Sequence, residues 1–143
     1  MFPCEIPDID GPGRPALPAL FSGGCHCGAV QFRVTVRTWR ASNCNCSMCT
    51  KKGFLHVIVP AADLELLRGA DQLTTYRFNT GVAQHHFCRV CGVHSFYVPR
   101  SHPDGFSVNA HCLTDVPPSW FDVERFDGQR WEQHVAKLAP AGS

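Results

Sequence analysis

The chain has 143 residues, of which 44% are hydrophobic and 17% are charged, as is usual for one globular domain. Its 13 basic and 12 acidic side chains give a formal net charge of +1, and no run of like charge is longer than Lys51-Lys52, which argues against nucleic acid or an anionic membrane as a partner. No apolar stretch approaches the roughly 18 residues that a membrane-spanning helix requires.

Residues 1–20 are rich in proline, and we expect them to form an extended N-terminal arm outside the folded domain. The segment lacks the basic stretch and the apolar core of a secretory signal. We therefore expect a cytoplasmic protein whose thiols stay reduced, a setting in which clustered cysteines favour metal binding over disulfides. Cys4 lies in this arm, far from the other cysteines, and receives no role.

The rest of the chain is typical of short strands separated by turns. Alternating apolar and polar residues predict a half-buried strand over 29–36, with Val30, Phe32, Val34 and Val36 on one face. Residues 61–68 fit either a short helix or a turn followed by a strand, and residues 50–53 fit a turn. Further strands are expected, in chain order, at 54–59, 71–78, 95–98, 106–113 and 120–126.

This pattern predicts a mainly β fold of short antiparallel sheets with little helix. We expect the folded domain to cover residues 21–132. Residues 133–143 form a C-terminal tail that frays.

Seven of the nine cysteines fall into three clusters, and this arrangement indicates metal sites. The central cluster has a C-x-C-x-x-C pattern, whereas each flanking cluster is a pair followed directly by glycine. Zinc favours tetrahedral sites of thiolate and imidazole, with four protein ligands in a structural site and three plus an open position in a catalytic one. The seven cysteines therefore divide naturally as four plus three.

The two flanking pairs resemble metal-binding knuckles, in which glycine relieves crowding in a tight turn and backbone N–H groups point at sulfur. Two such pairs from distant parts of the chain make one closed site. We expect this site to hold a structural zinc that stabilises the fold, with the ligands Cys25, Cys27, Cys88 and Cys91.

The central cluster supplies three ligands by itself, and we assign Cys44, Cys46 and Cys49 to a second zinc with one open position. Two alternatives stay open for it. A fourth protein ligand, either a histidine or Cys112, would close the site; without any metal the cluster would be a group of reactive thiols. The histidines otherwise receive no assigned role.

Three thiolates on Zn²⁺ make a poor Lewis acid but a good site for a fourth thiolate, whose sulfur stays ionised and nucleophilic. This chemistry predicts a thiol substrate that attacks a small electrophile. A thiol such as glutathione also carries carboxylates, which Lys51 and Lys52 would offset, with Arg77 and Arg100 as further candidates. The alternative for each cation is a solvated surface charge.

Several motifs resemble the glutathione-dependent formaldehyde-activating enzyme family, which includes proteins similar to centromere protein V. The resemblance covers residues 21–132 and rests mainly on the cysteine clusters. The motifs that carry it are Gly24-Cys25-His26-Cys27-Gly28-Ala29-Val30, Cys44-Asn45-Cys46-Ser47-Met48-Cys49, Thr74-Thr75-Tyr76-Arg77-Phe78, His85-His86-Phe87-Cys88-Arg89-Val90-Cys91-Gly92, Tyr97-Val98-Pro99-Arg100-Ser101, Pro103-Asp104-Gly105, Val108-Asn109 and Phe126-Asp127-Gly128-Gln129-Arg130-Trp131-Glu132.

The resemblance implies an Mss4-like β fold with two zinc sites, divided among the cysteines in the same way. It also implies synthesis of S-(hydroxymethyl)glutathione from glutathione and formaldehyde, which is carbon–sulfur lyase chemistry in reverse. Two other hypotheses remain: a binding or scaffold module in which both zincs only hold the fold, and a thiol-based redox or metal-buffering role. The sequence identifies neither the group that moves the proton nor the oligomeric state.

Overall fold

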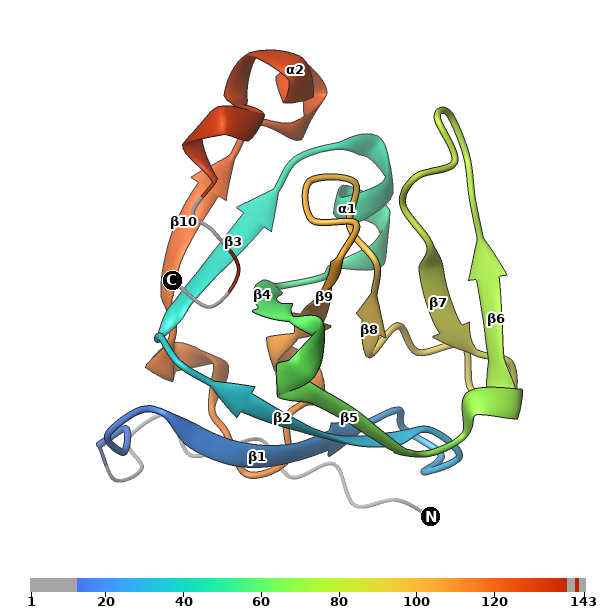
Figure 1. Ribbon diagram of the computed structural model, residues 1–143, viewed down its shortest axis with the longest axis vertical. Helices are drawn as coiled ribbons and strands as arrows, with labels where there is room; N and C mark the ends of the chain where they lie inside the picture. The colour runs from blue at the N-terminus through green and yellow to red at the C-terminus, as the bar shows by residue number, and fades with distance from the viewer. Residues whose placement is uncertain (1–12, 139–140, 142–143) are drawn as a thin grey trace.

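The computed structural model describes residues 13–138 and 141. Cys4 and most of the proline-rich arm lie outside this range. Three small sheets make up the fold (Figure 1). The first is antiparallel and contains β1 (Ala19–Gly24), β2 (Gln31–Val36) and β5 (Leu64–Arg68), in that order.

The second sheet has five strands, and it is antiparallel except for the parallel pairing of β3 with β10. Its strands, in spatial order, are β10 (Asp122–Phe126), β3 (Arg40–Cys44), β4 (His56–Pro60), β9 (Gly105–Asn109) and β8 (Phe96–Tyr97). The third sheet is the antiparallel pair β6 (Leu73–Tyr76) and β7 (His85–Cys88).

The helices are short and lie at the end of the molecule away from β1 and β2 (Figure 1). They are α1 (Ser47–Lys52) and α2 (Trp131–His134). Single 3₁₀ turns add η1 (Ala61–Asp63), η2 (Ala70–Gln72), η3 (Ala110–Cys112), η4 (Pro118–Trp120), η5 (Gly128–Arg130) and η6 (Val135–Lys137). No helix in the described part of the chain is both long enough and apolar enough to cross a membrane.

The core forms where the first sheet packs against the second. Val30, Phe32 and Val34 are fully buried, as the alternating pattern of this segment predicts. Phe32 meets Phe96 of β8 edge-on, with ring centroids 5.9 Å apart. This contact joins the first sheet to β8, which pairs with β9 in the second sheet.

The prediction of a mainly β fold built from short sheets is confirmed, with differences in detail. The expected turn at 50–53 is instead the last turn of α1 and its cap, because the Cys46 thiol accepts a hydrogen bond from the Cys49 N–H at the helix start and Gly53 closes the end with φ +63°. The expected all-antiparallel pairing is wrong for β3 and β10. Within the expected C-terminal tail of 133–143, α2 ends at His134 and a 3₁₀ turn covers Val135–Lys137.

Candidate metal centres and the cavity beside them

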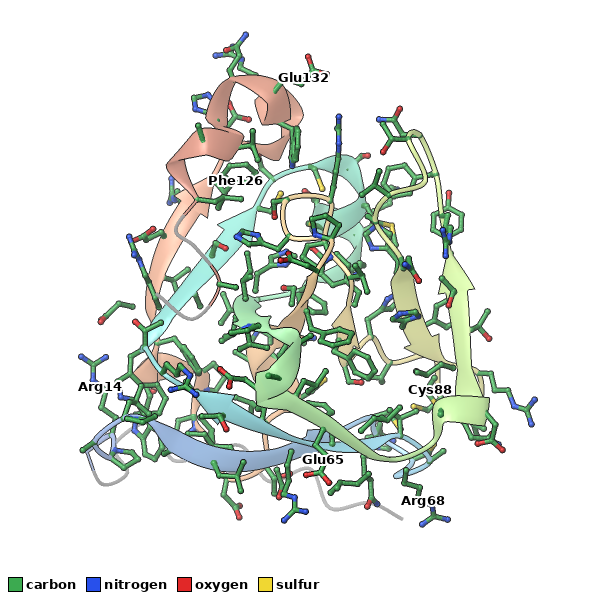
Figure 2. All side chains as sticks on the ribbon, in the orientation of Figure 1. Arg14, Glu65, Arg68, Cys88, Phe126 and Glu132 are labelled. Atoms are coloured by element: carbon green, nitrogen blue, oxygen red, sulfur yellow. The ribbon has the colours of Figure 1, made fainter. Side chains whose placement is uncertain are left out.

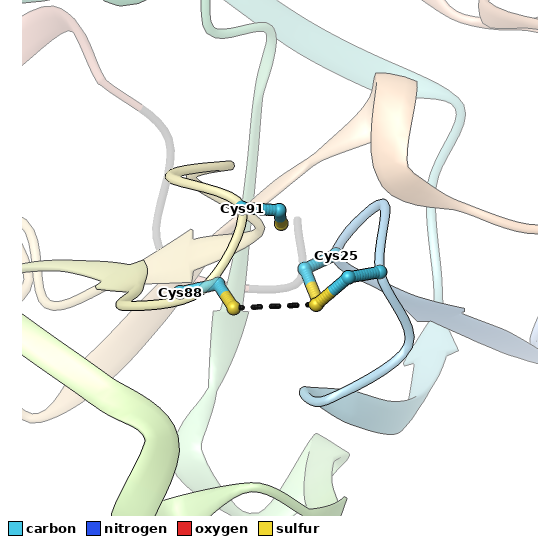
Figure 3. Close-up of side chains that lie close together, drawn as sticks. Cys25, Cys88 and Cys91 are labelled. Atoms are coloured by element: carbon cyan, nitrogen blue, oxygen red, sulfur yellow. Dashed lines mark hydrogen bonds between the residues drawn. The ribbon is translucent and has the colours of Figure 1, made fainter.

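Four cysteines from two distant segments meet at one corner of the fold. Cys25 and Cys27 lie in the loop between β1 and β2, whereas Cys88 ends β7 and Cys91 follows it. Figure 3 shows Cys88 and Cys91 facing Cys25 across the gap between the two segments. All four Sγ atoms lie within 4.8 Å of one another.

The local backbone explains why these sulfurs converge. Backbone N–H groups donate to sulfur in both segments, from Val30 to Cys25 at 3.3 Å and from Val90 to Cys88 at 3.4 Å. Each segment turns sharply at a glycine in the left-handed region, with φ +82° at Gly28 and +77° at Gly92. The two segments are therefore knuckles of the kind the sequence predicts.

The sulfur spacing fits a tetrahedral zinc site. A zinc–sulfur bond of about 2.3 Å with tetrahedral angles places neighbouring sulfurs about 3.8 Å apart. The Sγ atoms of Cys27 and Cys25 are 3.7 Å apart, and those of Cys27 and Cys88 are also 3.7 Å apart. This cluster could hold a metal ion with four thiolate ligands.

The second cluster is built around the start of α1. Cys44 ends β3, Cys46 caps the helix and Cys49 lies in its first turn. Their three Sγ atoms are also within 4.8 Å of one another. Among residues 13–138 and 141, no histidine nitrogen, carboxylate oxygen or further cysteine sulfur joins this group. Cys112, considered above as a closing ligand, instead places its Sγ 3.8 Å from the His94 carbonyl oxygen.

Electrostatics in the second cluster favour a bound cation. Hydrogen bonds from Cys44 and then Cys49 lower the pKa of Cys46 to about 2. The hydrogen bonds that Cys49 makes with Cys44 and Cys46 raise the pKa of Cys49 instead. Three thiols at contact distance thus cannot all ionise alone, and a divalent metal would remove this conflict.

The segment that follows β10 clamps the second cluster in place. Asn45 donates from Nδ2 to Asp127 Oδ1 at 3.1 Å and accepts at Oδ1 from the Gln129 N–H at 3.2 Å. Gln129 Nε2 returns a hydrogen bond to the Asn45 carbonyl oxygen at 3.2 Å. Gly128 lies between these contacts, so close to Cys44 Sγ that a Cβ would overlap that sulfur and would lie 2.8 Å from Cys46 Cβ.

A cavity of about 450 Å³ opens beside the second cluster and is lined by all three of its cysteines. Polar side chains from β4, β7 and the end of β8 form another part of its wall, namely His56, His85 and Tyr97. Arg100 also lines it, together with Trp131 of α2. The size is typical of a small-molecule site.

His56 presents an unpaired nitrogen in this region. Its Nδ1 lies 3.0 Å from Ser107 Oγ and 3.1 Å from the Tyr97 hydroxyl, while its buried Nε2 has no hydrogen-bond partner among the described residues. Burial lowers the pKa of His56 to about 3 and raises the pKa of Tyr97, so both are neutral. Where Nδ1 accepts from one of these two hydroxyls, the ring hydrogen sits on Nε2.

The two lysines proposed from sequence as substrate ligands have different surroundings. Lys51 is exposed, whereas Lys52 is partly buried, with Nζ 4.0 Å from the centre of the Tyr97 ring and 3.1 Å from His85 Nδ1. Neither lysine lines the cavity. Of the four cations considered, Arg100 lines it, and its guanidinium stacks on Trp131 at 3.8 Å.

Comparison with known proteins identifies the family of this chain. The family model described as glutathione-dependent formaldehyde-activating enzyme matches residues 20–126. The chain belongs to this family. A protein of Halomonas elongata, provisionally named a glutathione-dependent formaldehyde-activating enzyme, is 27% identical over 134 residues, which cover 78% of this chain and 85% of the relative. The crystal structure of a Rhodobacter sphaeroides protein is 37% identical with a TM-score of 0.68, and the match covers 73% of this chain and 99% of that one.

Sequence reasoning grouped the cysteines as the structure does and named Arg100 as a candidate cation, but it missed the other polar groups of the cavity wall, namely His56, His85 and Tyr97. His56 lies in a strongly apolar strand, where an isolated histidine is an unusual buried residue. A histidine among apolar strand residues was the sequence signal that could have pointed to His56. His85 and Tyr97 lie in motifs that carry the family resemblance, but no role follows from the sequence, because their proximity to the cysteines depends on how β7 and β8 pack against α1.

Replacing Gly128 with alanine should weaken the second metal site selectively. The new Cβ would overlap Cys44 Sγ, and the Asn45 contacts hold the loop against moving away. We expect at least a 10-fold loss of cobalt(II) affinity at this cluster, read from thiolate charge-transfer absorbance. The four-cysteine site should bind as before. Gly13→Ala is the control, because no atom lies within 4 Å of its Cβ position, and an equal loss in both variants would contradict the steric argument.

Proposed function

We propose that this protein is a zinc-dependent enzyme that adds a thiol such as glutathione to formaldehyde or a related small carbonyl, in the class of carbon–sulfur lyases. Membership of the family and the name of the Halomonas elongata relative support this reaction. One structural observation carries the proposal: a cluster of three cysteine sulfurs lines a cavity and has no fourth ligand among the described residues.

The chemistry follows from the donor set. A zinc ion held by Cys44, Cys46 and Cys49 would lower the pKa of a thiol that takes its fourth position. The sulfur of the thiolate then forms a bond with the carbonyl carbon, and the π electrons of the C=O bond move to oxygen. That oxygen needs a hydrogen-bond donor as its charge develops and a proton at the end. The zinc in the four-cysteine cluster would serve folding alone.

His56 is suited to the first of these needs. Its Nε2 has no partner in the described part of the chain, and the residue lines the cavity with the three cysteines. A neutral imidazole can donate to a developing alkoxide without giving up its proton. We infer that His56 stabilises the oxygen in this way, and that Tyr97 and Ser107 hold its ring in the required tautomer.

The rest of the cavity fits a thiol with carboxylates. Arg100 is held by its stacking on Trp131, while its nearest carboxylate, Glu132, is 4.0 Å away and well exposed. An ion pair of that length is weak, so the guanidinium keeps donors for a substrate carboxylate. We propose Arg100, in preference to Lys51 and Lys52, as the group that binds it.

A scaffold without catalysis is the competing hypothesis. It would call for four protein ligands at both zinc sites, as structural sites have. The described residues offer a fourth thiolate only at the first cluster, which supports the enzyme.

Serine substitutions should separate the two metal sites. Cys46→Ser removes one of three ligands at the cavity, so we expect a folded protein without activity above the uncatalysed rate. Cys88→Ser removes a fully buried ligand of the four-cysteine site and should lower thermal stability severely. Activity is measured as the NMR exchange rate between free formaldehyde and hydroxymethylglutathione, and stability by thermal melts. Equal destabilisation of both variants would contradict the division of roles.

Replacing Arg100 with methionine should raise the KM for glutathione by about 10- to 100-fold, because a hydrogen bond to a charged group contributes about 1.5–3 kcal/mol. The KM for 2-mercaptoethanol, which has no carboxylate, should stay the same. Arg68→Met is the control; Arg68 is exposed, and Figure 2 shows it at the far side of the molecule from Glu132. A similar rise for both thiols would exclude carboxylate binding by Arg100.

A further inference from the structure

The partly buried Lys52 and the buried His85 form a pair beside the cavity. Lys52 Nζ lies 3.1 Å from His85 Nδ1 and sits over two aromatic rings, 4.0 Å from the centre of Tyr97 and 4.5 Å from that of Phe54. The His85 ring is stacked between Tyr97 at 4.8 Å and Phe78 at 5.3 Å. His85 lines the cavity, whereas Lys52 does not. Of the two groups, the imidazole is therefore the one that can meet a substrate in the cavity.

The pair has a defined direction. An ammonium group has three donors and no acceptor, so His85 Nδ1 must accept from Lys52 and the ring hydrogen sits on Nε2. The two stacked rings hold the imidazole in this orientation. A proton can therefore move from Nζ to Nδ1 while another leaves Nε2.

We propose that Lys52 and His85 form a proton relay for the carbonyl oxygen of the substrate, a role that rests on the proposed thiol addition. As the carbon–sulfur bond forms and the oxygen gains the π electrons, the oxygen takes the proton of His85 Nε2. Nδ1 takes a proton from Lys52 in the same step. The products are a hydroxyl group, a neutral amine and a neutral imidazole.

The same route restores the pair. The next thiol loses a proton when it ionises, and that proton returns through Nε2 and Nδ1 to the Lys52 amine. The proton that the thiol releases therefore equals the proton that the alkoxide takes up, and the protein neither gains nor loses a proton over the cycle. His85 would be the catalytic residue that touches the oxygen, and Lys52 would act through it.

Local electrostatics agree with this role. Burial lowers the pKa of Lys52 to about 8, which keeps the amine charged at neutral pH yet able to release a proton. Burial, followed by repulsion from Lys52, lowers the pKa of His85 to about 4, so its ring stays neutral between transfers. The titratable groups that face the pair from the elements around it are Cys46, Cys49, His56, His86, His94 and Tyr97.

His56 cannot deliver a proton in the same way. Its Nδ1 is backed by the hydroxyls of Tyr97 and Ser107 rather than by an ammonium group. Burial raises the pKa of Tyr97, so no proton is available to replace one lost from His56 Nε2. The two histidines therefore have different roles, in which His56 donates a hydrogen bond to the oxygen and His85 delivers the proton.

The pH dependence of kcat tests the relay in the metal-loaded protein. Lys52 must be protonated to act, so wild-type activity should fall as the pH rises through about 8. Lys52→Met should lower kcat by about 100-fold or more and abolish this alkaline limb, that is, the fall of kcat as the pH rises through about 8. Lys52→Arg keeps the positive charge with a pKa above about 12, so this variant should also lose the alkaline limb. Measuring it keeps the test valid if the methionine variant does not fold. Lys51→Met, at the exposed neighbour, should leave the limb in place.

Nitrogen-15 NMR of the histidine rings gives a readout that does not depend on activity. His85 should carry its hydrogen on Nε2, and Lys52→Met should release this preference. A hydrogen on Nδ1, or a limb near pH 8 that survives in both Lys52 variants of an active enzyme, would overturn the relay alone. A wild-type protein that does not exceed the uncatalysed rate would overturn the proposed reaction together with the relay.

Discussion

The crowding of thiols in two small clusters is the interaction on which the rest of the structure depends. Seven sulfurs lie in groups of four and three, each within contact range of the others in its group. Thiolates at such distances repel, and neutral thiols make only weak hydrogen bonds. A metal ion would turn this repulsion into attraction, so its binding energy at the four-cysteine cluster would also be folding energy. That cluster joins the β1–β2 loop to the end of β7 and so links two of the three sheets.

The two clusters share one ligand chemistry but differ in what surrounds them. At the first, two knuckles supply four sulfurs and complete the tetrahedron. At the second, Asn45 ties the cluster to residues 127–129 on one side, while the other side opens on the cavity with His56 and His85 in its wall. We propose that reactivity comes from the fourth position, which no described residue fills, together with the neutral imidazoles of His56 and His85.

Local sequence patterns predicted the features that depend on neighbouring residues. The alternation in β2, the glycines after each cysteine pair and the four-plus-three division all follow from short-range geometry. The parallel pairing of β3 with β10 did not, because it joins residues about 80 positions apart in a strand, Arg40–Cys44, with little β propensity. Lys52 was expected to face a substrate carboxylate, but the helical turn that replaces the expected loop carries it toward Tyr97 and His85 instead.

Cadmium-113 NMR of the metal-substituted protein would test the open position at Cys44, Cys46 and Cys49 most directly, because the chemical shift reports the number of sulfur ligands. The account predicts two resonances of equal intensity. Added glutathione should shift the resonance of the three-cysteine site toward that of a four-sulfur site and leave the other unchanged. Two resonances that both ignore glutathione, or a single resonance from the four-cysteine cluster, would contradict the claim that this protein binds a thiol at its second metal.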